Sequence, residues 1–301
     1  MTALYVGLIS WIALFAHTPY ILFPELGALS HDIFKRPHGT WAKAPGMLVL
    51  TPLLTGLMGT ILVRNMGSGM VPILLATAAA ILIIRVLKSP IAPAISAGVL
   101  PISLGITSWH YPASLLVGLV LLAAISLVWR RIAPPPPVRT AAEVADDITE
   151  EAPRSYAWFP FFLVFLVGTA AVAEVTGWRL ILFPPLIVIG FEMFAHADVC
   201  PWAKKPLRLP VACTLSALVG VALVTAFGDA PLAVIASTAC GILILRVFDL
   251  HVPPALAVGL LPFVIPAVDY RFAASVGIGT LSLTMLFLLW RGLSKMYLSP
   301  P

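Results

Sequence analysis

The chain has 301 residues, of which 60% are hydrophobic and only 10% are charged, with a net charge of +5 at neutral pH. Soluble domains carry about 25% charged residues, so this chain has too few charged side chains to cover the surface of a soluble protein. The basic residues form no long tract with interleaved aromatic residues, which excludes an ordinary nucleic-acid-binding protein. The partner that the composition predicts is a lipid bilayer.

The first apolar run predicts a membrane-spanning helix from Thr2 to Tyr20. Residues 1–20 contain no lysine or arginine, and the apolar run continues through residues 21–23, unlike a cleavable secretory signal. We therefore expect a retained membrane helix. The absence of a targeting segment suits a bacterial inner membrane.

The rest of the first half alternates apolar segments with short polar loops. A short apolar piece from Pro24 to Phe34 opens with a proline that suits a helix start, and a basic loop follows from Lys35 to Pro45. The further apolar segments, of which the third is interrupted by prolines, are 47–63, 70–87, 90–109 and 111–129.

A hydrophilic stretch from Ala133 to Ser155 separates two apolar regions. It opens with four prolines, Pro134 to Pro137, which form a stiff, extended segment, and it continues with several acidic residues. We expect a solvated linker between a membrane repeat at 1–132 and a second membrane repeat at 156–301.

The second repeat copies the first at a spacing of 160 or 161 residues. Residues 21–24 (ILFP) recur at 181–184, and residues 81–87 (ILIIRVL) recur as ILILRVF at 242–248. The corresponding apolar segments are 157–178, 182–195, 209–227, 230–247, 251–268 and 271–290. Duplicated apolar units are typical of membrane transporters. We predict an all-α polytopic membrane protein with two homologous halves of about four or five transmembrane helices each, 8–10 in total.

The number of crossings per half decides how the halves are oriented. If the proline-broken segment crosses, each half has five crossings and the halves are inverted; if it is re-entrant, each half has four and the halves are parallel. Residues 91–108 would span about 27 Å as a helix at 1.5 Å per residue, which is long enough to cross, so we expect five.

The two proline-broken segments are the expected position of the site. Proline frees a backbone carbonyl, and a freed carbonyl inside a membrane must face protein or a wet cavity. Small residues at the helix-contact spacing accompany the breaks: Ala94 with Gly98, Ala255 with Gly259, Thr55 with Gly59, and Ser216 with Gly220.

Two arginines precede the broken segments, Arg85 and Arg246. Each either lines a site or reaches the membrane interface. A helix that starts after a proline offers amide groups to an anion, so a basic side chain beside it would complete an anion site. The candidate substrate-binding residues are Arg85, Arg246, His251, Pro93, Ala94, Pro253, Pro254 and Ala255.

A second group of polar residues is a candidate for proton coupling. His31-Asp32 corresponds in our alignment to Glu192-Met193, and Glu192 and His196 share one helix face. The alternative is that these side chains lie at the membrane surface.

Metal and enzyme chemistry have weaker support. Cys200, Cys213 and Cys240 form no CxxC pair, and the alternate spacing of His196, Asp198 and Cys200 makes a poor metal site. We expect neither a metal nor a cofactor. No Ser-His-Asp set or glycine-rich phosphate loop is visible, which disfavours an ordinary enzyme.

Several of these motifs together resemble the HPP family of integral membrane proteins. The matching pieces are FPELGA at 23–28, FPPL at 183–186, KAP at 43–45, KKPLR at 204–208 and HVPPA at 251–255. The resemblance covers about 21–131 and 181–291, although Val252 interrupts the signature and the first half has no histidine there. It implies a transporter, and plant plastid members of the family are associated with nitrite.

We therefore expect a transporter of a small, nitrite-like inorganic anion that binds between the two broken segments. A membrane enzyme acting on lipid or a lipid-linked group, and a non-transporting assembly subunit, are the alternatives. The sequence leaves a homo-oligomer open.

Overall fold

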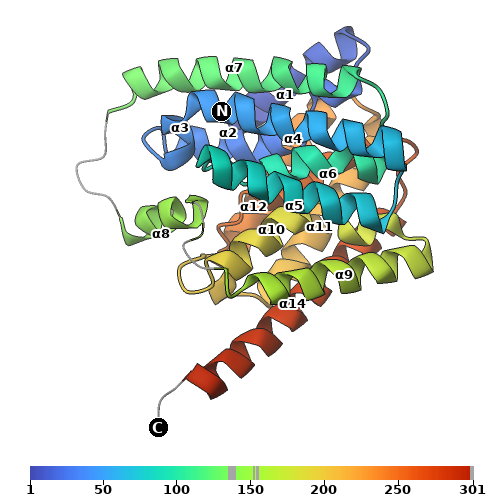
Figure 1. Ribbon diagram of the computed structural model, residues 1–301. Helices are drawn as coiled ribbons and strands as arrows, with labels where there is room; N and C mark the ends of the chain where they lie inside the picture. The colour runs from blue at the N-terminus through green and yellow to red at the C-terminus, as the bar shows by residue number, and fades with distance from the viewer. Residues whose placement is uncertain (135–139, 152, 154–155, 299–301) are drawn as a thin grey trace.

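A computed structural model describes residues 1–134, 140–151, 153 and 156–298, and every regular element in these ranges is a helix (Figure 1). Six of the helices are long and apolar enough to cross a bilayer. They are α4 (Pro45–Met66), α5 (Met70–Leu87), α7 (His110–Ile132), α9 (Phe159–Thr176), α11 (Arg208–Phe227) and α14 (Arg271–Leu298). The prediction of an all-α polytopic membrane protein is confirmed.

Shorter helices complete each half. In the first half these are α1 (Thr2–Phe15), η1 (Pro19–Ile21), α2 (Glu25–Lys35), α3 (Thr40–Lys43) and α6 (Ala94–Leu104). In the second half they are η2 (Arg179–Leu182), α10 (Pro184–Ala195), η3 (Trp202–Lys204), α12 (Pro231–Val247), α13 (Pro254–Leu260) and η4 (Leu261–Phe263). Helix α8 (Ala141–Glu150) lies between the halves.

The two halves interlock through their short helices. α1 packs on α12 of the other half, and α9 packs on α5. In the centre, α2 contacts α13 while α10 contacts both α6 and α13. These central helices are almost wholly buried by protein. A short helix is stable there because neighbouring helices, rather than lipid, surround its ends.

Close contacts between helices depend on glycine in both halves. A Cβ atom added to Gly59 of α4 would overlap the carbonyl of Gly98 in α6. The same would occur between Gly220 of α11 and Gly259 of α13. The small-residue pattern therefore marks two equivalent helix contacts, as expected for membrane helices.

Protein side chains satisfy the backbone groups that the prolines leave free in the first half. Pro101 has no N–H for the carbonyl of Ala97, and the hydroxyl of Tyr111 donates to that carbonyl at 2.7 Å. At the start of the same break, the indole Nε1 of Trp41 donates to the carbonyl of Pro90 at 2.9 Å. This break is therefore held by protein contacts.

Both halves end at the same face of the bundle, which also carries α8 and which we call the α8 face (Figure 1). Arg130 near the end of α7 donates to the carbonyl of Ala42 in α3 at 3.5 Å. In the second half, Arg291 of α14 donates to the carbonyl of Ala203 in η3 at 3.1 Å. α8 contacts α3 and α10 beside them.

The chain also starts at the α8 face. Ser10 of α1 donates to the carbonyl of Asp229, just before α12 begins at the opposite face. α1 thus ends at the opposite face, and α2 returns the chain to the α8 face. Each half therefore has an even number of helical segments that run between the two faces, so both halves start and end at the α8 face. The halves are parallel, and not inverted as we expected. The expectation failed because α2, with 11 residues, is too short for a lipid-facing helix but long enough inside a protein shell.

The linker also differs from its predicted form. Residues 141–150 fold into α8, whose capping box joins Thr140 and Glu143, and Asp146, Thr149 and Glu150 are buried. The described part of the linker is therefore docked on the bundle and is not a solvated spacer. Most of the predicted stiff proline run, at 135–137, lies outside the described residues.

Candidate polar site between the two halves

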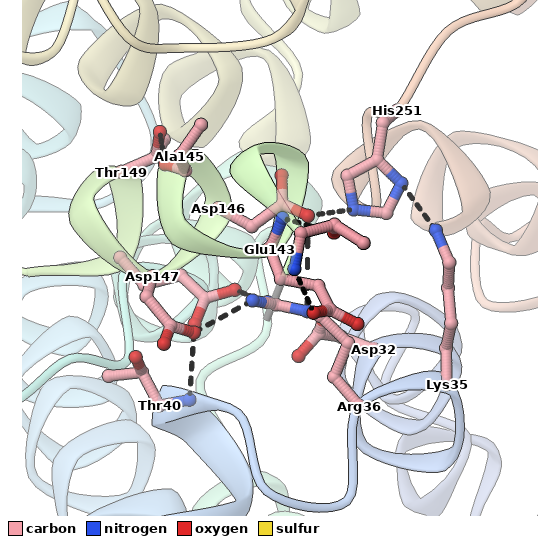
Figure 2. Close-up of polar contacts among 12 residues, drawn as sticks. Asp32, Lys35, Arg36, Thr40, Glu143, Ala145, Asp146, Asp147, Thr149 and His251 are labelled. Atoms are coloured by element: carbon pink, nitrogen blue, oxygen red, sulfur yellow. Dashed lines mark hydrogen bonds and ion pairs between the residues drawn. The ribbon is translucent and has the colours of Figure 1, made fainter. Parts of the chain in front are cut away.

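Arg36 is the centre of a buried charge cluster at the α8 face (Figure 2). It follows directly after α2, and its side chain is only 4% exposed. It lies 2.6 Å from Asp32 and 2.8 Å from Asp147, and it also pairs with Glu150. Although burial opposes its charge, the carboxylates of Asp32 and Glu150 hold the pKa of Arg36 above its usual value. The cluster fastens α8 to α2.

His251 connects the same cluster to the second broken segment. Its Nε2 lies 3.2 Å from an oxygen of Asp146 in α8, and its Nδ1 lies 3.3 Å from Nζ of Lys35 at the end of α2 (Figure 2). Nδ1 can accept a hydrogen bond from Lys35, whereas the close Nε2–Asp146 contact is not a hydrogen bond. His251 therefore contacts both α8 and the first half, while it belongs to the second half.

A small cavity lies directly beneath α8. It holds about 10 Å³, which is about the room that one water molecule needs. Its lining residues are Trp41, Asp146, Thr149, Glu150, Glu192, Trp202, His251, Pro253 and Pro254. One carboxylate oxygen of Glu192 and one of Glu150 have no hydrogen-bond partner. The cavity is too small for a solute in this conformation, and it contains carboxylates that are incompletely satisfied.

The structure brings together four of the predicted residues at this cavity: Glu192, His251, Pro253 and Pro254. The first broken segment does not contribute to it. Pro93 and Ala94 of the first half are buried in helix packing, as is Ala255 of the second half.

The two arginines lie away from the cavity. Arg85 is exposed, and its guanidinium lies 4.6 Å from the centre of the Tyr156 ring. Arg246 is also exposed at the end of α12. Both positions fit side chains at the membrane interface, and a role for either in binding stays a prediction.

The proton-coupling candidates lie close to the site, in a different register from the predicted one. α2 ends at Lys35 and α10 ends at Ala195, so Asp32 and Glu192 occupy equivalent positions. Our alignment, which paired His31 with Glu192, was shifted by one residue. Arg36 then corresponds to His196, whose burial lowers its pKa.

Sequence reasoning missed Arg36 and the acidic residues of α8. A usable signal was present, because Glu143, Asp146 and Glu150 recur at positions i, i+3 and i+7 and so share one helix face. A basic loop with Lys35 and Arg36 offered the complementary charge. Composition alone indicated solvent exposure instead.

Metal binding finds no geometric support within the described ranges, since no three histidine, cysteine or acidic side chains converge there as a metal site would require. Cys200 and Cys213 are buried, Cys240 is half-buried, and all three are free thiols.

Comparisons with protein-family models, with curated proteins and with solved structures find no match for this chain. The resemblance to the HPP family therefore stays a prediction, and the function has to be inferred from the site.

Proposed function

We propose that this protein is a proton-coupled transporter of a small solute, with its binding site between the halves at the cavity beneath α8. One observation supports the proposal most strongly. Asp32 and Glu192, at equivalent positions of the two halves, are almost fully buried carboxylates, and each has an oxygen without a hydrogen-bond partner. Such groups are costly inside a membrane and commonly belong to ion or proton pathways.

The charge of the cavity indicates how a solute would be coupled to protons. Asp146, Glu150 and Glu192 line it together with His251. A small anion would be repelled there by several kcal/mol in a medium of low dielectric constant unless the carboxylates bind protons first. Entry of an anion would therefore require proton uptake. The resemblance to the HPP family makes a nitrite-like anion the first solute to test.

The shape of the bundle suits alternating access. At the α8 face, the cavity between the halves is too small for a solute, and a larger depression of about 290 Å³ is lined by the first half and the linker alone. The opposite face has depressions at the seams between the halves. One of about 240 Å³ is lined by residues that include Ser10, Leu22 and Phe263. Another of about 130 Å³ is lined by residues that include Ser103 and Arg179. Rocking of two parallel halves about the central site would close these depressions and open the α8 face.

The distribution of basic residues supports an orientation. In the described ranges, the arginines at the opposite face are Arg64 at the end of α4, Arg179 in η2 and Arg271 at the start of α14. Most other lysines and arginines belong to the α8 face. By the positive-inside rule, the α8 face is cytoplasmic.

The test uses purified protein in liposomes with an inward proton gradient. We expect the gradient to drive nitrite accumulation, and Glu192→Gln or Asp32→Asn to reduce gradient-driven uptake at least tenfold. Asp198→Asn, which changes an exposed acid in the loop after α10, is the matched control and should leave uptake unchanged.

Methylammonium serves as a cationic comparison solute in the same liposomes. If the protein takes up methylammonium but does not take up nitrite, anion transport is refuted. Absence of any proton-coupled flux of either solute would refute the transporter proposal.

A further inference from the structure

Glu25 is a further buried carboxylate, and the proposed solute site does not include it. It lies in the first turn of α2, it is 0% exposed, and neither of its oxygens has a hydrogen-bond partner. Pro185 occupies the equivalent position of the second half, so the carboxylate is a feature of one half alone.

The surroundings of Glu25 are apolar. Phe23 and Leu26 beside it in the chain are buried, and Gly27 in the same helix lies against Leu256 and Leu260 of α13. An ionised carboxylate in such a place would lose its hydration without compensation, and the resulting cost is several kcal/mol or more.

The polar groups that face Glu25 offer no positive charge. The hydroxyl of Ser96 in α6 is its polar neighbour. From α7, the hydroxyl of Tyr111 interacts with it electrostatically but already donates to the carbonyl of Ala97. Among the described residues, no lysine or arginine forms an ion pair with Glu25.

The next acidic groups toward the α8 face are Asp32 of α2 and Glu192 of α10, which occupy equivalent positions. Glu25 lies seven residues before Asp32, so it is about 10 Å further from the α8 face at 1.5 Å per residue. Glu192 lines the cavity beneath α8, and its carboxylate interacts electrostatically with Glu25. On the other side of Glu25, Leu22 lines the depression at the opposite face. Glu25 thus lies between this depression and the cavity beneath α8.

We propose that Glu25 is a proton-binding site inside the bundle, neutral in this conformation, and that it exchanges its proton with Glu192. The transfer leaves one carboxylic acid and one carboxylate before and after, because Glu25 loses the proton that the carboxylate of Glu192 gains. The net charge of the pair is unchanged, so the step does not require an additional buried charge. The coupling role rests on the proposed function, whereas the protonation of Glu25 does not.

Infrared difference spectroscopy tests the protonation without any solute. The carbonyl stretch of a protonated carboxylic acid is separate from the bands of a carboxylate. At pH 7 we expect one such band in the wild-type protein that Glu25→Gln removes and that the exposed-acid control Asp198→Asn retains. A spectrum of Glu25→Gln that loses a carboxylate band instead would overturn the proposal.

The stability of the same variant gives a second readout. Glutamine resembles the neutral acid in shape and charge, so Glu25→Gln should melt within about 2 °C of the wild type. A large rise in melting temperature would indicate that an ionised carboxylate had been removed.

Counterflow in liposomes tests the coupling role. Exchange of labelled for unlabelled nitrite needs no net proton movement, so Glu25→Gln should retain exchange while gradient-driven accumulation falls at least tenfold. Full accumulation by this variant would remove Glu25 from the coupling path. If no variant or wild-type protein exchanges any solute but the infrared band is present, the transporter proposal fails while the proton site stands.

Discussion

Replacing Arg36 by methionine should release α8 from the bundle. Arg36 contacts Asp32 and Glu150 and lies 2.8 Å from Asp147, while its own side chain is 4% exposed. Methionine keeps much of the volume and removes the charge, which leaves several carboxylates close together without a cation. Removing one partner of a buried ion pair costs about 3–5 kcal/mol.

The protein can reduce this cost by letting α8 move into water, where its carboxylates are hydrated. The loss therefore appears first as local opening, and hydrogen exchange measures such opening directly. Since about 1.4 kcal/mol corresponds to a factor of ten, a loss of about 3 kcal/mol should accelerate amide exchange in residues 141–150 by about 100-fold or more. Amides of α4 should be protected to the same extent as in the wild type.

Two further variants complete the experiment. Arg131→Met removes an exposed arginine at the same face and should change exchange in α8 by less than about threefold, as is usual for exposed charges. Adding Asp32→Asn and Glu150→Gln to Arg36→Met should restore part of the protection, because the neutralised side chains no longer repel each other. Unchanged exchange in Arg36→Met would show that the charge cluster does not hold α8.

Two other predictions concern packing and topology. Gly59→Ala should destabilise the protein by about 3 kcal/mol in thermal unfolding, because its Cβ would overlap the carbonyl of Gly98, whereas Gly168→Ala in α9, where a Cβ meets no atom within 4 Å, should be neutral or stabilising by up to about 1 kcal/mol. Equal effects of the two substitutions would contradict the close α4–α6 contact. In a variant whose native cysteines are replaced by alanine, a membrane-impermeant thiol reagent added outside intact cells should label Asp269→Cys at the opposite face and spare Asp198→Cys at the α8 face. Labelling of both or of Asp198→Cys alone would refute the proposed orientation.

Sequence patterns were sufficient for the helices that face lipid. Such helices must be long and apolar, so segments such as 70–87 were predicted at the observed bounds of α5. The paired glycines were also informative, because close backbone approach allows few other residues. α2 was different: Ser30, His31 and Asp32 lower its hydropathy, and only its burial by other helices shows that it returns the chain across the bundle.

The site was predictable only in part, for a related reason. Pro253 and Pro254 predicted an irregular segment, and the structure places both residues at the cavity. The docking of α8 depends on Arg36, whose pairing with residues more than 100 positions away has no local signature. Arg85 and Arg246 were predicted to bind substrate because charged residues are rare in this chain. A charged residue at a helix end, however, is compatible with the membrane interface as well as with a pocket.

Joining the halves in one polypeptide has a consequence for how each half can specialise. Two identical subunits related by a twofold axis must present the same side chain twice wherever they meet. Here a single acidic helix covers the junction, and the positions of Glu25 and His251 are filled by prolines, Pro185 and Pro90, in the other half. In a fused chain, equivalent positions of the two halves can carry different side chains, so one half can contact solute where the other supports the fold. A homodimer of single repeats could not differ in this way, because its symmetry requires the same side chain at both positions.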